Sequence, residues 1–335
     1  MHVGIIGHGT WLPSTFMSAQ DISAATGIPE DVITLKFGVK RKPVASPGET
    51  TASLGLHAAR RALADAGISG GEVDLVIWCG AQHKDYPCWL AGLHVADQIG
   101  AKNAWSFDME AMCGSMMAAL DIAKSLIIAR EDLETVLLVS GYRNNDLIDL
   151  KEPATRFMLD IGSGASALVL RKNAGRNAVL ASAFRGDGSF SEMCVVPTLG
   201  SKAWPPSPGD ESRAHFIVPD EEAFKNKLNE LTLPNFYAVI RESLQRSGAR
   251  AIDYLAILHF KRSAHGAVLK ELGLGPANTT YLEDYGHLGQ NDQVFSLELG
   301  LAAGKVRDGS TVVFVGAGLG FVWAATVIAW GPFKE

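Results

Sequence analysis

The chain of 335 residues contains only four cysteines, and their arrangement excludes two structural uses. Cys79, Cys88, Cys113 and Cys194 form no CxxC pair and have no zinc-ligand spacing, which argues against a metal site and a disulfide framework. Reduced thiols in a protein of this size are typical of the cytoplasm. Residues 1–7 also lack the basic stretch and following apolar stretch of a signal peptide. We therefore expect a cytoplasmic location and no metal.

Clusters of basic residues and long hydrophobic runs are scarce as well. A net charge of −6 with no block of lysine or arginine argues against nucleic acid and against an anionic membrane surface as partners. No run approaches the length of a membrane span, so we expect no membrane insertion. Hydrophobic residues make up 47% of the chain and charged residues 20%, a composition that predicts a soluble globular enzyme with room for two domains.

Short β-branched runs alternate with helical stretches, and this alternation predicts an α/β fold whose sheets are covered by helices. The expected strands are Val3–Gly7, Asp74–Cys79, Thr135–Ser140, Ala165–Leu170, Val179–Ala183, Tyr254–Leu258, Thr311–Val315 and Val322–Ala329. The expected helices are Thr51–Ala66, Trp89–Ile99, Cys113–Ala129, Leu233–Ser247, Ala264–Leu272 and Val294–Ala303. Residues Thr198–Pro219 are rich in proline, glycine and serine and predict a surface excursion.

A weak internal repeat divides the chain into two similar halves. The stretch Ala58–Trp78 is a helix that ends at glycine, a short loop and a buried strand, and Arg241–Ile257 has the same order. Because the two halves repeat these elements, we expect residues 1–174 and 175–335 to be related domains. In the second half the buried strand leads directly to His259.

Two glycine-rich stretches resemble nucleotide-binding loops only superficially. The spacing of Gly4–Gly9 is not GxGxxG, and Pro13 interrupts any helix after it. Gly316–Gly320 leads into another strand instead of a helix. Because neither stretch opens a βαβ unit, a Rossmann dehydrogenase is disfavoured. The absence of a GxSxG elbow argues against a serine hydrolase of that plan.

The thiol of Cys113 lies where a short mixed segment runs into a long apolar helix. At such a turn the unpaired backbone N–H groups and the positive end of the helix dipole favour a nucleophilic thiolate. Most free cysteines are instead buried small apolar residues, and the local sequence leaves both interpretations open.

Two histidines strengthen the first interpretation. His259 follows the end of a buried strand, where catalytic groups of α/β folds often lie, and His287 lies in a glycine-flanked loop before a helix. Each alone is more often a structural histidine. A thiolate, two imidazoles and a glycine-rich turn that presents backbone N–H groups nevertheless form a coherent acyl-transfer set.

Four segments in collinear order resemble motifs of the β-ketoacyl-acyl carrier protein synthase III family of condensing enzymes. They are Phe37–Thr51, Asp108–Leu120, Asp160–Ala167 and Gly318–Trp330. The resemblance implies a thiolase-like α/β fold, with two similar halves forming a layered αβαβα core. It also implies an acyltransferase without a cofactor, with thioesters of coenzyme A or of acyl carrier protein as substrates.

The resemblance implies roles for individual residues. Cys113 matches the acyl-accepting nucleophile and His259 the first catalytic histidine. Gly320 matches the glycine whose N–H forms the oxyanion hole together with that of Cys113. Tyr86 falls where the family places a residue that reaches across a dimer interface, so a homodimer is expected. His287 stands where the family has a catalytic asparagine.

Other departures concern the substrate. Val32 stands at the position of the aromatic residue that stacks on the adenine of coenzyme A, with Lys36 in place of a nearby arginine. With Arg156, Lys261, Arg262 and Tyr86, Lys36 completes the candidate substrate-binding set. Lys261, Arg262 and Tyr86 indicate a polar or carboxylated acyl group, or Lys261 and Arg262 simply face solvent or a phosphate.

The resulting hypotheses share an acyl group on Cys113. In the leading one, the acyl-enzyme condenses with a malonyl-type thioester and releases CO2. In the alternative, motivated by His287, the acyl group passes to an alcohol or amine without decarboxylation. A third hypothesis, a non-catalytic subunit of a heteromeric condensing enzyme, is disfavoured because Cys113 and His259 are retained.

Overall fold

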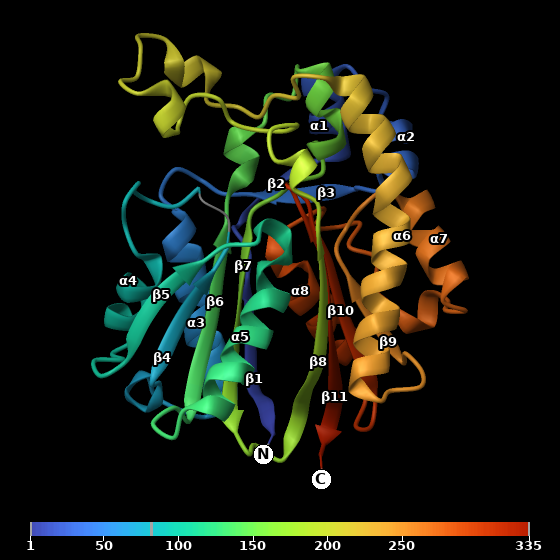
Figure 1. The fold of residues 1–335 in the computed structure, drawn as a ribbon. Helices are drawn as coiled ribbons and strands as arrows, with labels where there is room; N and C mark the ends of the chain where they lie inside the picture. The colour runs from blue at the N-terminus through green and yellow to red at the C-terminus, as the bar shows by residue number, and fades with distance from the viewer. Residues whose placement is uncertain (1, 81–82, 334–335) are drawn as a thin grey trace.

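Nine strands in one hydrogen-bonded order form the centre of the molecule, in a computed structural model that describes residues 2–80 and 83–333 (Figure 1). The order is β5-β4-β6-β7-β1-β8-β11-β10-β9. The strands are β1 (Val3–Trp11), β4 (Leu75–Cys79), β5 (Trp105–Met109), β6 (Thr135–Tyr142), β7 (Gly164–Lys172), β8 (Arg176–Gly186), β9 (Tyr254–Ile257), β10 (Thr311–Gly318) and β11 (Val322–Pro332). A separate hairpin pairs β2 (Thr15–Ser18) with β3 (Arg41–Val44).

The nine strands divide into a group of five and a group of four. The two groups meet through a single registered pair, Gly4 with Ala178, between β1 and β8. In each group parallel strands lie on one side, β5-β4-β6 and β10-β9, and antiparallel pairs lie next to them. The first group lies before residue 174 and the second after it. The arrangement agrees with the internal repeat, and the domain boundary itself stays a prediction.

Helices form three layers around the two groups of strands. Helices α3 (Thr51–Ala66) and α4 (Ala91–Gln98) cover the outer face of the first group, and α6 (Glu221–Ser247) covers that of the second. Helices α5 (Ser115–Ala129) and α8 (Asp292–Ala302) contact strands of both groups and therefore lie between them. The five-layered α/β architecture predicted from the sequence is confirmed.

Local sequence explains where these helices begin and end. Helix α3 starts after Thr50, whose side chain accepts a hydrogen bond from the backbone N–H of Ser53, and it ends at Gly67 with a φ of 67°. In α5 the residues that face the sheets are apolar and fully buried, among them Met116, Leu120 and Ile127. Burial on both sides accounts for the continuous apolar composition of this central helix.

Several elements differ from the sequence-based expectation, among them the hairpin strands β2 and β3, which were not expected. Strand β5 was not expected, because its half-buried residues mix polar and apolar side chains at the edge of the sheet. Helix α6 begins at Glu221 and continues through Pro234, whereas the pattern predicts a start at Leu233, since most of its buried residues lie after the proline. Helices α1 (Ala19–Thr26) and α2 (Glu30–Val32), which precede a π-helical turn at Ile33–Phe37, were also not expected.

The surface excursion predicted at 198–219 is confirmed. Residues 198–219 form an irregular arm with short 3-10 turns, seen at the upper left of Figure 1.

The expectation that no hydrophobic run approaches the length of a membrane span is wrong. Among the described residues one stretch, Met112–Ala129, is 18 residues long and apolar enough to cross a membrane. This stretch contains the central helix α5, whose place between the two strand groups explains its composition.

Candidate active site

The nucleophile turn joins β5 to α5 and is fixed by a buried serine. The 3-10 turn Met112–Gly114 carries Cys113, and α5 begins two residues after the thiol. The hydroxyl of Ser115 accepts a hydrogen bond from the backbone N–H of Ala111 (2.8 Å) and donates one to the carbonyl of Met112 (2.6 Å). Met112 has a φ of 47°, in the left-handed region that non-glycine residues rarely adopt. The thiol thus lies at a turn before the apolar helix, as predicted, and the backbone is strained at the residue before it.

Strand β10 approaches this turn closely because glycine stands at the contact. A Cβ on Gly318 would lie 2.6 Å from Cβ of Met112, 2.7 Å from the carbonyl oxygen of Ala111 and 2.8 Å from the backbone nitrogen of Cys113. These distances leave no space for any side chain at position 318. The nucleophile turn from the first half therefore packs directly on a strand of the second half.

We expect Gly318→Ala to displace the nucleophile turn. Overpacking against backbone atoms costs about 1–3 kcal/mol of unfolding free energy, and a shift of the thiol of about 1 Å costs about 100-fold in reaction rate. Urea unfolding and the rate of thiol acylation measure the two effects. Gly266→Ala is the matched control, because a Cβ there meets no atom within 4 Å. Wild-type acylation by Gly318→Ala would contradict the proposed contact.

His287 contacts the thiol and is itself held by a carboxylate. Its Nε2 lies 3.2 Å from Sγ of Cys113, and its Nδ1 lies 2.6 Å from Oδ2 of Asp292. Asp292, which is fully buried at the start of α8, also accepts hydrogen bonds from the backbone N–H groups of Leu288 (2.6 Å) and His259 (2.7 Å). The nucleophile, an imidazole and an orienting carboxylate thus form a Cys–His–Asp set.

The electrostatics of this set favour a proton on the imidazole. Burial opposes a charged ring, but the carboxylate of Asp292 and the sulfur of Cys113 together raise the pKa of His287 well above its usual range. A protonated His287 beside the sulfur stabilises the thiolate, which is the reactive form.

Tyr142 packs against the same site. Its ring centroid lies 6.3 Å from that of His287, and only 2% of the residue is exposed. Burial raises the pKa of Tyr142 well above its ordinary value, and the charges of Cys113 and Asp292 raise it further. The phenol therefore stays protonated. Gly289, with a φ of 64°, makes room for it, because a Cβ there would lie 2.6 Å from the ring.

His259 lies near this set but faces other partners. Its Nδ1 lies 2.9 Å from Oδ2 of Asp160, and its Nε2 lies 3.3 Å from the carbonyl oxygen of Gly38. No hydrogen bond found among residues 2–80 and 83–333 joins His259 to Cys113. The two histidines are connected through Asp292, which accepts from the backbone of one and from the ring of the other.

A buried lysine supports the second carboxylate. Lys42 is 2% exposed and donates to the carbonyl oxygen of Leu159 (2.7 Å). Burial lowers the pKa of Lys42 to about 8, while the charge of Asp160 opposes this shift. Lys42, Asp160 and His259 are therefore three neighbouring titratable side chains beside the Cys–His–Asp set.

The sequence analysis gave no role to Asp292, Asp160, Lys42 or Tyr142. Asp292 could have been suspected from its place five residues after His287, at the start of a helix. Lys42 carried no such signal, because it stands in a basic run that is typical of a solvated surface.

His265 lies behind His259 and predicts a pH-dependent stability. It is 6% exposed, it packs at 4.9 Å on the ring of Tyr281, and its ring nitrogens have no partner among the described residues. Burial lowers the pKa of His265 to about 4. The unfolded chain therefore binds this proton more readily than the folded protein between pH 6.5 and about 4, so stability falls as the pH falls through this window.

The unfolding free energy of the wild type falls between pH 6.5 and pH 4, and we expect His265→Phe to make this fall smaller by about 3 kcal/mol. The size follows because one pKa unit corresponds to about 1.4 kcal/mol. Urea unfolding at a series of pH values measures the slope. His57→Phe is the control, because His57 is exposed and stacks on Trp11. If the unfolding free energy of His265→Phe depends on pH as in the wild type, burial of the neutral ring is not the cause of this dependence.

The remaining residues predicted from the sequence belong to other elements of the fold. Gly320 lies in the turn between β10 and β11, and both strands contact the nucleophile turn. Lys36 and Arg262 belong to two contacting elements, the π-helical turn Ile33–Phe37 and α7 (Arg262–Glu271), and are exposed. Arg262 pairs with Glu283 at 2.6 Å.

Two further cations are exposed on the surface, and Tyr86 lies at a cavity. Nζ of Lys261 lies 5.8 Å from the ring centroid of Phe37, and Arg156 is exposed on a 3-10 turn (Pro153–Met158). Tyr86 is 65% exposed and lines a cavity whose described wall does not include Lys36, Lys261 or Arg262.

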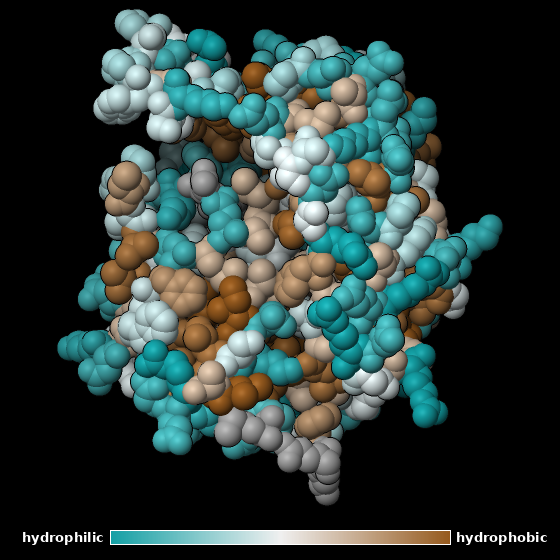
Figure 2. Space-filling view, in the orientation of Figure 1, coloured by the Kyte–Doolittle hydropathy of each residue, from teal (hydrophilic) through white to brown (hydrophobic). Residues whose placement is uncertain are grey.

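A cavity of about 790 Å³ adjoins the nucleophile turn. It meets this turn at Met112 and the β10–β11 turn at Leu319 and Gly320, and Leu199 and Phe216 of the excursion form part of its wall. Figure 2 shows the hollow beneath the excursion. No group of three or more His, Cys, Asp or Glu side chains in the described parts of the chain is arranged to hold a metal.

An α/β fold with a Cys–His–Asp set of this geometry is typical of enzymes that use a cysteine nucleophile. The model of 3-oxoacyl-[acyl-carrier-protein] synthase III matches residues 107–188, and the model of its C-terminal part matches residues 245–330. The synthase III of Paramagnetospirillum magneticum is 27% identical over 335 residues, covering 97% of this chain and 98% of the relative. That of Agrobacterium fabrum is 26% identical over 332 residues, with the same coverage.

Solved structures show the same fold. The synthase III of Pseudomonas aeruginosa superposes with a TM-score of 0.85 at 24% identity and full coverage of both chains. That of Aquifex aeolicus gives 0.84 at 22% identity, covering 98% of this chain and 100% of the other. A variant of OleA from Xanthomonas campestris gives 0.81 at 19% identity over 98% and 99%. The chain belongs to the β-ketoacyl-acyl carrier protein synthase III family of thiolase-fold condensing enzymes as a distant member, and it is an acyltransferase of that family.

Proposed function

We propose that the protein takes an acyl group from a thioester of coenzyme A or acyl carrier protein onto Cys113. The observation that carries this proposal is the contact of 3.2 Å between Sγ of Cys113 and Nε2 of His287, which is held by Asp292. Sγ attacks the thioester carbonyl, the carbon–sulfur bond to the donor breaks, and His287 gives its proton to the leaving thiol. The backbone N–H groups of Cys113 and Gly320 are the proposed donors to the oxyanion.

In the second step, the acyl-enzyme condenses with a malonyl-type thioester. Loss of CO2 from the malonyl group leaves an enolate, whose carbon attacks the acyl carbonyl and releases the Cys113 thiolate. After the donor thiol has left, His287 takes up a proton from solvent, which its raised pKa favours, and its Nε2–H can then donate to the enolate oxygen. The family's synthase III members make this the leading proposal. The role of His259 as a second donor requires its Nε2 to turn away from Gly38.

A second candidate is transfer to an alcohol or amine without decarboxylation. One observation favours it: both ring nitrogens of His259 face acceptor oxygens, so that, among the described residues, His287 is the imidazole in contact with the thiol. A single base held by Asp292 is what deprotonation of a hydroxyl or amine acceptor needs.

One experiment separates these outcomes. The purified protein is incubated with a panel of acyl-coenzyme A and acyl carrier protein thioesters, and its intact mass is measured. Malonyl-coenzyme A labelled at the carboxyl carbon is then added, and released CO2 is counted. We expect an acyl adduct and labelled CO2. An adduct without CO2, discharged by hydroxyl or amine acceptors, identifies the second candidate. Absence of any adduct overturns the proposal.

Exposed cations offer a place for the thioester's phosphates. Lys36, Lys261 and Arg262 lie at the contact between the π-helical turn and α7, and Arg156 is exposed on its own turn. Arginine and lysine side chains of this kind bind phosphate groups. Because Arg262 is paired with Glu283, Lys36 and Lys261 are the stronger candidates among the residues at that contact.

We further propose that the protein forms a homodimer through β5. This strand is last in the sheet order, so one of its edges has no neighbouring strand among the described residues. Exposed apolar side chains lie on it and around it: Trp105, Leu90, Leu93 and Ile122. Figure 2 shows apolar side chains gathered on this side of the molecule. An unpaired edge strand with apolar surroundings suits a second copy of the same strand. The cytoplasmic location stays a prediction.

A further inference from the structure

Two aspartates hold the two histidines of the site in a reciprocal arrangement. Asp292 accepts hydrogen bonds from the ring of His287 at 2.6 Å and from the backbone N–H of His259 at 2.7 Å. The contacts of Asp160 are the converse. Its carboxylate lies 2.9 Å from Nδ1 of His259, and its backbone carbonyl accepts from the N–H of His287 at 2.9 Å. Each aspartate therefore orients the ring of one histidine and fixes the backbone of the other.

The backbone contact between Asp160 and His287 depends on a glycine. Gly286 has a φ of 64°, and a Cβ there would overlap the carbonyl oxygen of Asp160. On the other side of His287, its carbonyl oxygen accepts from the N–H of Gly162 at 2.9 Å. The two segments are thus paired through their main chains, and this pairing does not use the carboxylate of Asp160.

Strand β3 holds both ends of the turn that carries Asp160. The buried Nζ of Lys42 donates to the carbonyl oxygen of Leu159 at 2.7 Å. The N–H of Ser163 donates to the carbonyl oxygen of Pro43 at 2.8 Å. Asp160 itself is 7% exposed. Because the backbone is fixed before and after this residue, its carboxylate has a defined place from which it can orient a ring.

The carboxylate of Asp160 decides how the ring of His259 is held. A carboxylate oxygen accepts hydrogen bonds, so Nδ1 is the donor in this pair and Nε2 is the nitrogen left for another partner. Nε2 lies 3.3 Å from the carbonyl oxygen of Gly38, so it already faces an acceptor oxygen at long range. When an enolate oxygen replaces that of Gly38 at Nε2, the contact at Nδ1 is what keeps the ring in place.

We propose that Asp160 is a positioning residue for the decarboxylating step, in which it holds His259 by Nδ1 so that Nε2 can donate to the enolate of the malonyl-type thioester. Asp160 acts through His259. Acylation uses the separate set of Cys113, His287 and Asp292, so it does not need the carboxylate of Asp160. The inference rests on the condensing function proposed above.

The test measures the two steps separately. Asp160→Ala removes the carboxylate and keeps the backbone carbonyl that holds His287. Acylation by acetyl-, butyryl- and octanoyl-coenzyme A is followed by intact mass at short times. Carboxyl-labelled malonyl-coenzyme A is then added to the acyl-enzyme, and released CO2 is counted. We expect acylation close to the wild-type rate. The kcat of CO2 release should fall by about 10–100-fold with little change in KM, which is the size of one hydrogen bond to a charged group.

A second variant tests whether the hydrogen bond is the cause. Asp160→Asn keeps an oxygen in the same place, so its side chain can still hold the ring of His259. We expect it to recover part of the CO2 release that Asp160→Ala loses. Urea unfolding of each variant identifies the conditions under which it is folded, and the rates are compared there.

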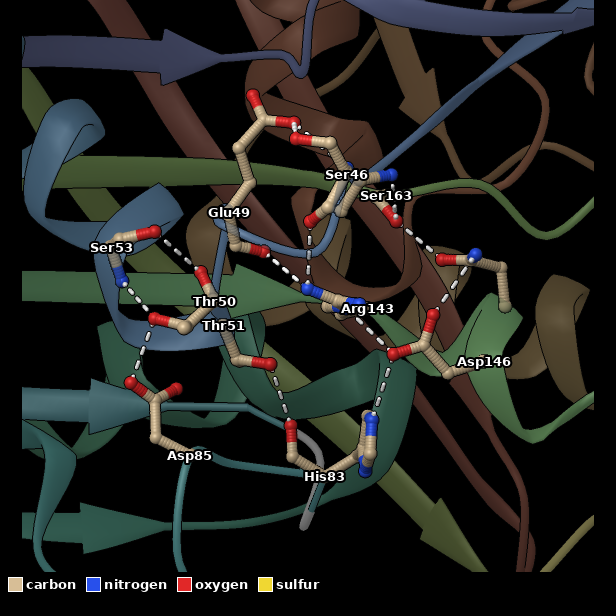
Figure 3. Close-up of polar contacts among 12 residues, drawn as sticks. Ser46, Glu49, Thr50, Thr51, Ser53, His83, Asp85, Arg143, Asp146 and Ser163 are labelled. Carbon is tan, nitrogen blue, oxygen red and sulfur yellow. Dashed lines mark hydrogen bonds and ion pairs between the residues drawn. The ribbon is translucent and has the colours of Figure 1, made fainter.

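Asp146→Ala is the matched control, because Asp146 pairs with a different histidine. Its Oδ2 lies 3.2 Å from Nε2 of His83, and Figure 3 shows this pair beside Arg143. Arg143 also donates to the carbonyl oxygens of Ser46 (3.1 Å) and Glu49 (2.6 Å), so it stays anchored when Asp146 is removed. The control is expected to keep the wild-type rates of both steps.

The outcomes separate this inference from the proposed function. Wild-type CO2 release by Asp160→Ala, an equal loss of acylation and CO2 release, or no recovery in Asp160→Asn overturns the inference and leaves acyl transfer onto Cys113 intact. A wild-type adduct without CO2 overturns the condensing step and this inference together. Absence of any adduct in the wild type overturns the function on which the inference rests.

Discussion

Cys113→Ala is expected to carry no acyl group after incubation with any thioester donor, and its turnover is expected to fall by at least about 10⁴-fold. The thiol is the group at 3.2 Å from the imidazole of His287, so its removal leaves no nucleophile for covalent catalysis. Intact-mass spectrometry and single-turnover rates measure this loss.

Cys79→Ala is the matched control for a lost thiol. Cys79 is fully buried in β4, and burial raises its pKa to about 12, so its thiol stays protonated and unreactive. The control is expected to keep the acyl adduct. An adduct that persists in Cys113→Ala and disappears in Cys79→Ala would overturn the assignment of the nucleophile.

Asp292→Asn is expected to slow acylation by about 10³–10⁴-fold without removing the thiol. The carboxylate is the main favourable cause of the raised pKa of His287, and a neutral amide neither stabilises the imidazolium nor holds its Nδ1–H. With the carboxylate lost, the pKa of His287 falls, so the variant should lose its imidazolium, and the rate that depends on it, at a lower pH than the wild type does.

The pH profile distinguishes this effect from simple misfolding. Asp292 also accepts hydrogen bonds from the backbone of Leu288 and His259, so Asp292→Asn is expected to lose some stability. Unfolding by urea identifies the range in which the variant is folded, and rates are compared within it. A folded variant with the wild-type rate and pH profile would show that Asp292 does not act through His287.

Sequence periodicity predicted most strands and helices of the core, because each buries a face whose apolar residues recur at a regular spacing. Helix α3 occupies the expected residues, Thr51–Ala66, since both its cap and its apolar face can be read locally. Strand β5 could not be predicted, because its position at the sheet edge leaves its residues only half-buried. The same limit applies to the first half of α6, which buries little.

The candidate site was predictable at its nucleophile and less so around it. Cys113 and His287 were expected from a turn and a glycine-flanked loop, and the structure places them in contact. The choice of His287 over His259 as the partner of the thiol depends on which oxygens face each ring. Those oxygens belong to Asp160, Gly38 and Asp292. Contacts of this kind join residues up to 221 positions apart, so they cannot be read from the sequence.

The packing of the nucleophile turn against β10 gives the thiol a second use, as a reporter. The sulfur belongs to the first strand group, and both the imidazole and the strand that Gly318 brings close belong to the second. Any opening between the two groups would separate thiolate from imidazolium before either group loses its own structure. The rate at which Cys113 reacts with a simple alkylating reagent would therefore follow the closure of the two strand groups, with the chain's own chemistry and without an added label.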